Sequence, residues 1–393
     1  MRDGGDLERK LFFFGPQPVL SCCLHRPPVQ AVFRYLVSGN PMNWIFQKQT
    51  LPYIFRGITF RPRPRYQIPA MATATAAALA VAKAGTTQCK VVLAATVAKT
   101  LFDEVQTTLK TLQRKPKLVG FLANDDPASR TYAEWTEKTC QQYGLEFELR
   151  EVDKDELEQA VIAANEEDAV DGGIIYFPVF GTKQDQYLQQ ILDVSKDVEG
   201  LSHKYIFNMY QNIRFLDEAK TQKSILPCTP LAVIKILEYI GAYNKIIPYG
   251  NRLFGRTIAV INRSEVVGRP LAALLANDGA SVYSVDINNI QHFTRGEGVK
   301  MHRHHAVDTD LKVEDVIPKC DVVITGVPSK GYKFPVELLK DGAICINFSS
   351  EENFGPEIMN KASIYVPAIG RVTIAILLRN LVRLCQYRQI NSA

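Results

Sequence analysis

The sequence TIAVINRSEVVGRPLAALLAN, residues 257–277, decides the fold class of this chain. It opens with an apolar, β-branched run, which predicts a buried strand over 257–262. A polar loop follows, and Pro270 then opens a run that predicts a helix over 270–277. A strand, a loop and a helix in this order can bind the phosphates of a dinucleotide, because the amides at a helix N-terminus face an anion. The GxGxxG fingerprint is absent, so this spacing alone is weak evidence.

The next predicted strand, 281–286, ends in Asp286, 22 residues after Ser264. An acid about 20 residues after the loop can accept hydrogen bonds from the ribose 2′-hydroxyl of NAD, and it would repel the 2′-phosphate of NADP. The plainer alternative is an acid that ends a strand before a turn, but the strand-loop-helix-strand context favours the ligand. A glycine at 326, where a third strand ends, permits close approach of the nicotinamide ribose. We therefore predict an NAD site made by Arg263, Ser264, Asp286, Ile287, Gly326, Val327, Pro328 and Ser329.

The rest of the chain alternates in the same way. Apolar periodicity, proline starts and glycine stops predict further helices over 97–112, 127–143, 156–165, 184–192, 230–243 and 372–386. Apolar runs predict further strands over 118–122, 145–152, 173–177, 321–327 and 343–348. This alternation is typical of an α/β fold with parallel sheets covered by helices on both faces. The prolines within 225–230 predict a rigid joint between two halves, with ligands in a cleft at the carboxyl ends of the strands.

Length and composition indicate two globular domains and a tail. The chain has 393 residues, of which 46% are hydrophobic and 22% charged, and these fractions exclude a disordered or collagen-like protein. No apolar run approaches the roughly 18 residues that a membrane-spanning helix needs. The eight cysteines are scattered without a CxxC pair, which predicts reduced thiols of an intracellular protein.

Residues 1–86 differ from the body in charge. They hold eleven Lys and Arg residues and three acids, whereas the remainder has a net charge of −3 and gives no reason to expect nucleic acid. An arginine-bearing, acid-poor start is typical of a mitochondrial transit peptide. Alternatively, Met71 is the true start and residues 1–70 come from a wrong gene boundary. We favour the second interpretation, with a cytoplasmic protein, because Phe12-Phe13-Phe14 and Cys22-Cys23 are unusual in a cleaved presequence. Either way, we expect an extension that is disordered or misassigned.

Four ordered motifs carry a family resemblance: Tyr132 in the helix after the first strand, KDVEGL at 196–201, PCTP at 227–230 and RSEVVGRP at 263–270. Over about residues 88–390 the chain resembles the methylenetetrahydrofolate dehydrogenase/cyclohydrolase family. YFPVFG at 176–181 and DQYLQQ at 185–190 resemble its monofunctional, NAD-dependent fungal branch. The resemblance implies a folate-binding α/β domain over 87–227, a Rossmann-like NAD-binding domain over 228–370 and a C-terminal helix, 371–393, that returns to the first domain. It also implies a homodimer in one-carbon metabolism that serves purine biosynthesis.

The resemblance further implies oxidation of 5,10-methylenetetrahydrofolate to 5,10-methenyltetrahydrofolate. It places the folate at Tyr132, Tyr176, Asp185 and Glu199, and it places Cys228 and Tyr132 at the reacting centre. The role of Cys228 stays open. A helix that opens just after it would favour a reactive thiolate, and a small buried thiol is the plainer alternative.

Departures from the family pattern bear on a second activity. The bifunctional pattern has a lysine four residues after the tyrosine, and here that position is Thr136. Glu199, Tyr176 and Asn262 replace an aspartate, a glutamine and a glycine of the pattern. Because the lysine serves hydrolysis of the methenyl bridge, we expect cyclohydrolase activity to be lost while hydride transfer survives.

Two other functions remain open: a bifunctional enzyme that hydrolyses with a different residue, and a non-catalytic dinucleotide-binding regulator. Formyltetrahydrofolate release would identify the first, and folate-dependent NADH formation would exclude the second. The run from His302 to His305 could suggest a metal, but an arginine interrupts it and the spacing of zinc ligands is not met. We therefore expect no metal and no membrane partner.

Overall fold

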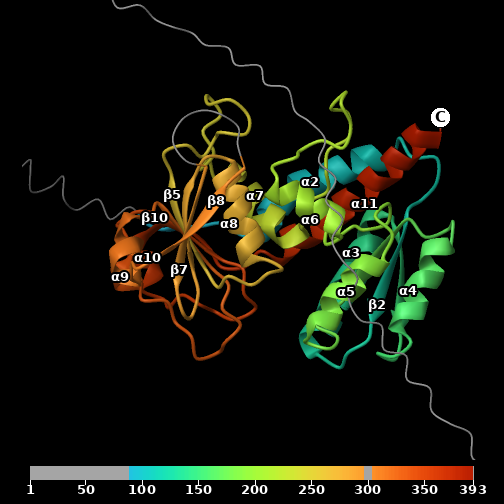
Figure 1. Cartoon of the computed structure of the whole chain (residues 1–393), viewed down its shortest axis with the longest axis horizontal. Coiled ribbons are helices and arrows are strands. Elements are labelled where there is room, and N and C mark those ends of the chain that lie inside the picture. Colours follow the sequence, from blue (N-terminus) through green and yellow to red (C-terminus); the bar gives the residue numbers. More distant parts are fainter. Residues whose placement is uncertain (1–87, 296–302, 393) are drawn as a thin grey trace, which may run out of the picture. The chain divides into compact units, whose positions relative to one another are not determined.

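The computed structural model describes residues 88–295 and 303–392 of the chain (Figure 1). The predictions for residues 1–86 lie outside this part. Two sheets are present there, one of three strands and one of eight. Both contain the parallel strands and covering helices that the sequence predicts.

The three-stranded sheet has the order β3-β2-β4, and its strands are parallel. It consists of β2 (Lys117–Leu122), β3 (Glu146–Glu151) and β4 (Gly172–Ile175) with α3 (Pro127–Tyr143), α4 (Leu157–Glu166) and α5 (Lys183–Ile191). Side chains alternate along β2: Val119 and Phe121 pack with α4 and α5, while Leu118 and Leu122 join the core on the opposite face. Both faces are therefore buried, as predicted.

Local capping residues determine where α3 begins and ends. The Asp126 carboxylate caps the helix by accepting a hydrogen bond from the Ser129 amide at 3.0 Å, and Pro127 occupies the first turn. Gly144 ends the helix in the left-handed conformation, with φ of 80°. The observed range equals the predicted 127–143.

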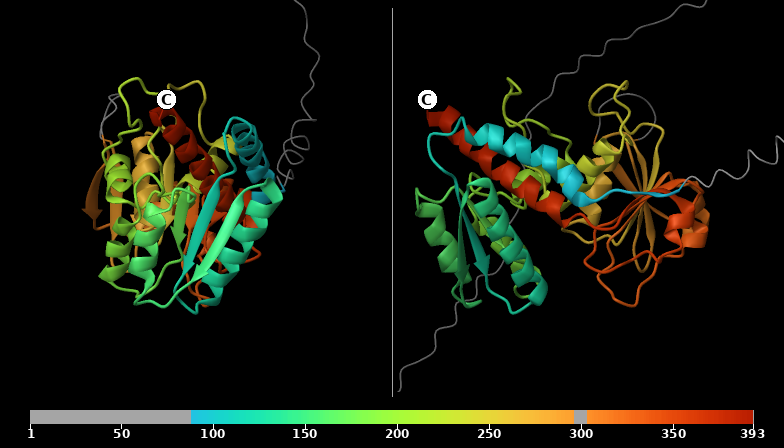
Figure 2. Two further views of the ribbon diagram at one scale, coloured as in Figure 1. Left: turned by 90° about the vertical axis from the view of Figure 1, so that its right-hand side faces the viewer. Right: turned by 180° about the vertical axis from the view of Figure 1, so that it is seen from behind.

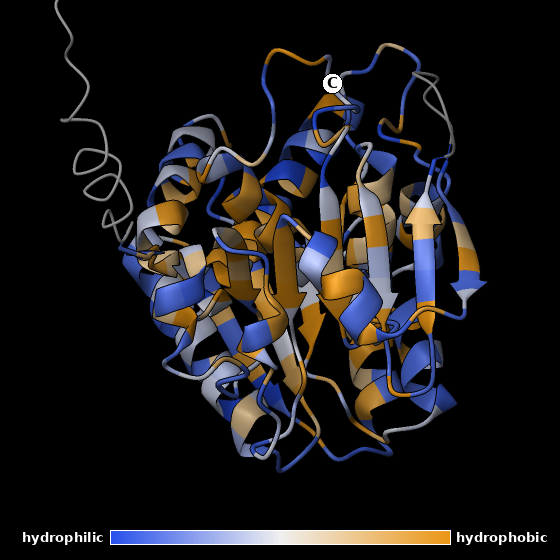
Figure 3. Ribbon diagram, turned by 90° about the vertical axis from the view of Figure 1, so that its left-hand side faces the viewer, coloured by the Kyte–Doolittle hydropathy of each residue, from blue (hydrophilic) through white to orange (hydrophobic). Residues whose placement is uncertain are grey.

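The eight-stranded sheet has the order β1-β11-β10-β9-β5-β6-β7-β8. Its strands are β1 (Lys90–Val91), β5 (Thr257–Ile261), β6 (Ser281–Val285), β7 (Ile290–Thr294), β8 (His305–Thr309), β9 (Val322–Thr325), β10 (Ala343–Asn347) and β11 (Ala362–Val366). Helix α8 (Gly268–Asn277) covers one face, and the short α9 (Val313–Val316) and α10 (Ile358–Lys361) belong to the other side. Figure 3 shows hydrophobic colour in the central strands and more hydrophilic segments toward the β7–β8 edge.

Several elements are absent from the sequence prediction. Strands β7 and β8 pair antiparallel, so the large sheet is mixed rather than wholly parallel. Four of the five residues of β8 are exposed, and for this reason the strand has little apolar signal. Strand β1, with two residues, and the eight-residue α6 (His203–Tyr210) are too short for a clear period, and β11 is a further strand that was not predicted.

Helix α11 (Gly370–Ser392) is longer than the 372–386 that periodicity predicts and close to the 371–393 that the resemblance implies, and it packs along α2 (Ala94–Leu109) and α7 (Cys228–Tyr239). Figure 2 shows α2 and α11 side by side. Strands β1 and β11 pair in parallel, and each leads into one of these two helices. On α11, Leu381 is fully buried and packs over Gly172 of β4, where a side chain would collide with it. A glycine in β4 thus permits α11 to lie against the small sheet.

Near its end, α11 is also tied to the small sheet by charge. The buried Asp171 carboxylate accepts hydrogen bonds from Arg114 at 2.7 and 2.8 Å and from Arg388 of α11 at 3.0 Å. The same carboxylate accepts a hydrogen bond from the Lys117 backbone amide at 2.9 Å, so that each of its two oxygens accepts two hydrogen bonds. One acid therefore links the start of β2, the start of β4 and the last helix.

We predict that Leu381→Ala lowers the free energy of unfolding by about 2–5 kcal/mol, because it opens a cavity between α11 and β4. Ile390→Ala on the same helix is the control: that side chain is 58% exposed, and its removal should change stability by less than about 0.5 kcal/mol. Equilibrium urea unfolding followed by circular dichroism measures both values. Equal effects of the two substitutions would contradict the packing described for α11.

Candidate active site

A cavity of about 570 Å³ lies at the N-termini of α7 and α11. Its lining comes from α3, the segment 199–201, the PCTP segment, the loops after β5, β10 and β11, and the start of α11. The lining residues are Ala128, Tyr132, Glu199, Leu201, Pro227, Cys228, Thr229, Pro230, Val266, Asn347, Phe348, Ser349, Ser350, Glu352, Pro367, Ala368, Ile369, Gly370 and Thr373. Three residues predicted for the site, Tyr132, Glu199 and Cys228, therefore meet in one cavity.

Tyr132 forms part of the cavity wall from α3. Its ring meets that of Tyr176 edge-on, with 5.9 Å between the centroids. Burial raises the pKa of the Tyr132 phenol well above its usual value, and the neighbouring Cys228 and Glu199 add to the rise. Tyr132 thus remains a neutral aromatic surface with a hydroxyl group.

Tyr176 and Thr136 lie behind Tyr132. Tyr176 is buried and is not part of the cavity lining, and its phenol faces the Thr136 side chain. Thr136 is fully buried, and its hydroxyl donates to the Tyr132 carbonyl at 2.8 Å. Thr136 stands at the position of the lysine of the bifunctional pattern, but its hydroxyl turns toward the helix backbone through this bond. Contact of Tyr176 with a ligand stays a prediction.

Glu199 is held in the cavity by the residues around it in the KDVEGL motif. The Lys196 ammonium donates to three carbonyls at the end of α4 at 2.8–2.9 Å. The buried Asp197 accepts from the amides of Gly200 and Ser202 at 2.8 and 2.7 Å. Burial and the nearby Asp197 raise the pKa of Glu199 to about 8, so it is largely protonated at neutral pH. A protonated carboxyl can donate a hydrogen bond to a ligand.

Cys228 begins α7 rather than preceding it, because the helix starts two residues earlier than predicted. Its thiol donates to the Val198 carbonyl at 3.4 Å, and Asn380 of α11 lies 3.6 Å from the sulfur. Burial raises the pKa of Cys228 well above its usual value, and the charges of Glu199 and Asp197 act in the same direction. The lowered pKa that a nucleophilic thiolate needs is therefore absent, although the thiol borders the cavity.

Asp185 lies apart from the cavity lining. Its carboxylate accepts from the amides of Val179, Phe180 and Gly181 at 2.8–3.3 Å, which fixes the loop between β4 and α5. The structure thus gives Asp185 a role in shaping this loop. A direct contact with substrate stays a prediction.

The large sheet changes direction between β5 and β9, since the chain continues from β5 to β6 on one side and returns to β9 on the other. Ligands of open α/β sheets bind at such a switch point, at the carboxyl ends of the strands. Asn262 follows β5 with φ of 82°, a left-handed conformation that asparagine tolerates better than most residues. Its amide donates to the Gly326 carbonyl at 2.7 Å. Asn262, which replaces the glycine of the family pattern, therefore keeps the left-handed backbone conformation and links the ends of β5 and β9.

Two glycines at this switch point have packing reasons. A Cβ at Gly268 would overlap the Asn262 carbonyl, so the start of α8 can lie close to the end of β5. A Cβ at Gly326 would overlap the Phe348 ring. The Phe348 side chain thus requires a glycine at 326, in addition to any approach of the cofactor.

The Arg263 side chain makes its hydrogen bonds with other groups of the protein. Its guanidinium donates to the Ser284 hydroxyl and carbonyl at 3.0 and 2.6 Å and to the Asn289 side chain at 2.7 Å. Asp286 directly follows β6, near this guanidinium, and is half-buried. Ile287 beside it is 96% exposed. An arginine held in this way has few free donors for a 2′-phosphate, and the adjacent carboxylate is available to a ribose hydroxyl.

Ser264 and the segment 327–329 lie at the remaining strand ends. The Ser264 hydroxyl accepts from the amides of Val267 and Gly268, both at 3.3 Å, at the N-terminus of α8. After Gly326, the Val327 amide donates to the buried Asn353 side chain at 2.8 Å, and the Val327 carbonyl accepts from the half-buried Ser349 hydroxyl at 2.9 Å. Contacts of Pro328 and Ser329 with the cofactor stay predictions.

Sequence reasoning missed the asparagines that support the loop after β10. The Asn347 amide donates to the carbonyls of Glu351 and Pro367 at 2.8 and 3.1 Å, and Asn353 is fully buried. Both residues order segments that line the cavity or adjoin it. The available signal was a polar residue at the carboxyl end of an apolar strand, Ile346-Asn347, where parallel strands place functional groups.

His304 packs on Phe293, with ring centroids 5.5 Å apart, and burial lowers its pKa to about 4. Within residues 88–295 and 303–392, no three His, Cys, Asp or Glu side chains are arranged to hold a metal ion. His302 lies outside these ranges. All six cysteines of the described part are free and buried, and no helix there is long and apolar enough to cross a membrane.

Comparison with known proteins places this arrangement in a family. Residues 92–199 match the tetrahydrofolate dehydrogenase/cyclohydrolase catalytic domain, and residues 227–300 match the NAD(P)-binding domain of that family. The methylenetetrahydrofolate dehydrogenase [NAD(+)] of Schizosaccharomyces pombe is 61% identical over 301 residues, which cover 76% of this chain and 94% of the relative. The chain belongs to the tetrahydrofolate dehydrogenase/cyclohydrolase family.

A solved structure and a bifunctional relative extend the comparison. The NAD-dependent 5,10-methylenetetrahydrofolate dehydrogenase of Saccharomyces cerevisiae has a TM-score of 0.74 and 52% identity, with 78% of this chain and 100% of that chain covered. The bifunctional protein FolD of Helicobacter pylori is 30% identical over 195 residues, which cover 48% of this chain and 61% of the relative. The chain is thus more similar to the two dehydrogenases than to this bifunctional protein, and the predicted fold class is confirmed.

The raised pKa of Glu199 predicts a pH-dependent stability. Between the usual value of 4.5 and the folded value of about 8, the folded protein binds more protons at this site than the unfolded chain does. The contribution of Glu199 to stability is therefore fully present below pH 4.5 and is lost as the pH rises through 8. Between pH 4.5 and 8, the free energy of unfolding of the unmodified protein should fall by on the order of a few kcal/mol relative to that of Glu199→Gln, whose side chain cannot ionise.

Urea unfolding of both proteins at several pH values between 5 and 9 measures this difference. The expected result is a growing advantage of the glutamine variant at high pH. A difference that does not change with pH would show that Glu199 is ionised throughout, as an ordinary surface carboxylate would be.

Proposed function

We propose that this chain oxidises 5,10-methylenetetrahydrofolate to 5,10-methenyltetrahydrofolate with NAD. The similarity to dehydrogenases of that name, over most of both chains, supports the reaction. The cavity supports the substrate, since Tyr132, Glu199 and Cys228 converge there with the loop after β10. Residues 92–199 and 227–300 correspond to the catalytic and NAD(P)-binding parts of the family.

Hydride transfer needs little acid–base chemistry from the protein. The methylene carbon loses a C–H bond, its electron pair leaves with the hydride, and the lone pair of the adjacent folate nitrogen forms the C=N bond of the product. Bound NAD supplies the nicotinamide C4 that accepts the hydride. No proton has to move in this step, so the main tasks of the site are to position two rings and to exclude water.

The described residues suit these tasks. The Tyr132 ring provides an aromatic wall for the pterin, and a protonated Glu199 can donate a hydrogen bond to its polar edge. Leu201, Ile369 and the prolines of the PCTP segment add apolar surface that limits water. Arg263, Asp286 and the strand ends around Gly326 would hold the dinucleotide.

The single observation that carries the loss of hydrolysis is the composition of the cavity. Among the described residues that line it, none is Lys, Arg or His. The bifunctional pattern hydrolyses the methenyl bridge with a lysine that moves protons, and this lining has no such cation. The thiol of Cys228 and the phenol of Tyr132 have raised pKa values, and we assign the Glu199 carboxyl to the polar edge of the pterin as a hydrogen-bond donor. We therefore propose a dehydrogenase without cyclohydrolase activity.

Two further proposals follow from the family resemblance. The chain forms a homodimer, and strand β8 offers an edge of the large sheet for pairing, with Val307 59% exposed. It acts in the cytoplasm, in one-carbon metabolism that serves purine biosynthesis. Sedimentation velocity tests the dimer, and N-terminal sequencing of the native protein distinguishes the cytoplasmic form from an imported one.

We predict NADH formation from NAD and methylenetetrahydrofolate, with a clear preference for NAD over NADP. Asp286→Ser should lower kcat/KM for NAD and narrow the gap between the cofactors, because it removes both the ribose contact and the repulsion of the 2′-phosphate. Absorbance of the reduced cofactor, with both cofactors titrated, measures this. Asp310→Ser is the matched control, since it removes an exposed carboxylate beyond β8. A preference for NADP in the unmodified protein would contradict the cofactor assignment.

We also predict that methenyltetrahydrofolate decays at its spontaneous rate in the presence of the protein. General acid–base catalysis typically accelerates such a step by roughly 10²–10⁴-fold, and this protein lacks the lysine that would provide it. Thr136→Lys should restore little hydrolysis, because the position is fully buried behind Tyr132. The decay is followed by the absorbance of the methenyl form. Enzyme-dependent decay comparable to dehydrogenase turnover would instead support a bifunctional enzyme.

A further inference from the structure

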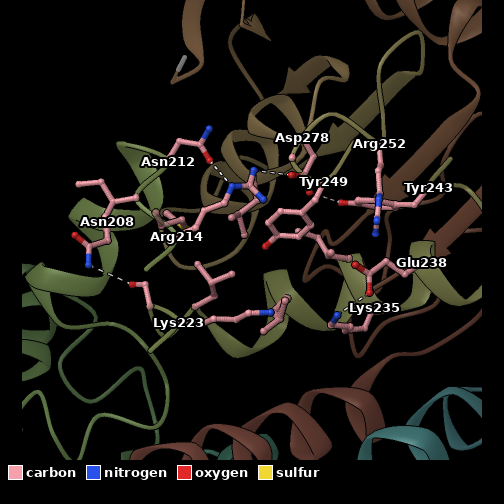
Figure 4. Close-up of a pocket in the computed structure, with 18 of the residues that line it drawn as sticks. Asn208, Asn212, Arg214, Lys223, Lys235, Glu238, Tyr243, Tyr249, Arg252 and Asp278 are labelled. Atoms are coloured by element: carbon pink, nitrogen blue, oxygen red, sulfur yellow. Dashed lines mark hydrogen bonds and ion pairs between the residues drawn. The ribbon is translucent and has the colours of Figure 1, made fainter. Parts of the chain in front are cut away.

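A second cavity, of about 140 Å³, lies far along α7 and α11 from the first. The first cavity is lined by Cys228 and Thr373 near the starts of these helices, whereas the second is lined by Lys235 of α7 and Arg383 of α11. Figure 4 shows side chains from several segments directed toward this space around Tyr249. We call it the cationic pocket, because six basic side chains line it: Arg214, Lys223, Lys235, Arg252, Arg379 and Arg383.

The cationic pocket holds more positive than negative charge. Its lining includes two acids, Glu238 and Asp278, against the six basic residues. Asp278 pairs with Arg214 at 2.7 Å and Glu238 pairs with Lys235 at 2.6 Å. Arg379 pairs with Glu104 of α2 at 2.6 Å. These pairs neutralise three of the six basic side chains.

The other three cations, Lys223, Arg252 and Arg383, have no carboxylate within 4 Å among the described residues. Arg383 is half-buried, and Arg379 lies one turn away on the same face of α11. Burial and this like charge lower the pKa of Arg383. A guanidinium that is partly removed from water without a counter-charge is unfavourable, and an anion in the pocket would relieve the cost.

The geometry suits a compact oxyanion. A water-sized group needs at least about 10–15 Å³, so a cavity of this volume has room for several such groups but not for a whole nucleotide. Tyr249 orients the cations: Arg214, Arg252 and Lys223 lie 5.0, 5.8 and 6.0 Å from its ring centroid. Arginine forks match the oxygens of phosphate, which favours a tetrahedral anion.

We propose that the cationic pocket binds a phosphate group, as inorganic phosphate or as the end of a small phosphomonoester. Its principal ligands are Arg383, Arg252 and Lys223. The residues come from α11 and from the segments before and after α7, so a bound phosphate connects parts of the chain that are distant in sequence. The site is separate from the cofactor phosphates, which would lie at Ser264 and the start of α8.

Isothermal titration calorimetry of the full chain with inorganic phosphate, at constant ionic strength set with sodium chloride, tests this. The expected result is saturable binding that weakens roughly tenfold or more in Arg383→Gln and in Arg252→Gln, as expected for loss of one charge-assisted hydrogen bond. Lys204→Gln, which removes an exposed lysine of α6, is the matched control and should bind as the unmodified protein does. Two pocket variants are used because either one alone could be poorly folded.

A second titration with saturating NAD separates the two phosphate sites. The proposal expects phosphate binding to persist when NAD is present, and loss of binding would place the anion in the cofactor site and overturn it. A titration with phenyl phosphate distinguishes a phosphomonoester from inorganic phosphate as the ligand. If phenyl phosphate binds as tightly as inorganic phosphate, the pocket accepts monoesters; if it does not bind, the ligand is inorganic phosphate. Binding that is unchanged in both pocket variants, or the absence of saturable binding, would also overturn the proposal.

Discussion

The side-chain amide of Asn380, buried in the middle of α11, is the contact on which the arrangement of the active site depends. It donates to the carbonyls of Val198 and Leu226 at 2.9 and 3.3 Å, and it lies 3.6 Å from the Cys228 sulfur. Val198 belongs to the KDVEGL segment and Cys228 to the PCTP segment, which Leu226 directly precedes, and both segments line the larger cavity. A buried amide whose partners are removed is costly, so these hydrogen bonds fix the two segments against one helix. The last helix of the chain thereby sets the positions of Glu199 and Cys228.

These two segments place mainly uncharged groups around the cavity. Burial and the nearby Asp197 raise the pKa of the Glu199 carboxyl, and burial, Glu199 and Asp197 raise the pKa of the Cys228 thiol. Both groups are largely protonated at neutral pH, and none of the described lining residues supplies a cation. Such surroundings agree with a reaction driven by the electrons of the substrate and by the placement of two rings. They do not suit the activation of water. The basic side chains gather instead at the far ends of α7 and α11, in the cationic pocket.

Much of the fold could be predicted from local sequence signals. Helix α3 was predicted to the residue because a capping acid, a first-turn proline and a terminal glycine are all local signals. Strands β7 and β8 could not be predicted, since their pairing is a tertiary event and β8 faces solvent. The meeting of Tyr132, Glu199 and Cys228 was implied by the family motifs. The burial of Thr136 and Tyr176, the binding of Arg263 by Ser284 and the supporting asparagines at 347 and 353 required coordinates. These features depend on where a side chain turns, which sequence spacing does not determine.

A crystal structure of the protein with NAD and a stable folate analogue tests the central claim most directly. The account predicts a pterin ring against Tyr132 and within hydrogen-bond distance of Glu199, with the ribose 2′-hydroxyl on Asp286 and the nicotinamide near Gly326. The Cys228 sulfur should keep its contacts with Val198 and Asn380 in that complex. A folate bound outside the larger cavity, or a dinucleotide whose ribose lies away from Asp286, would contradict the account.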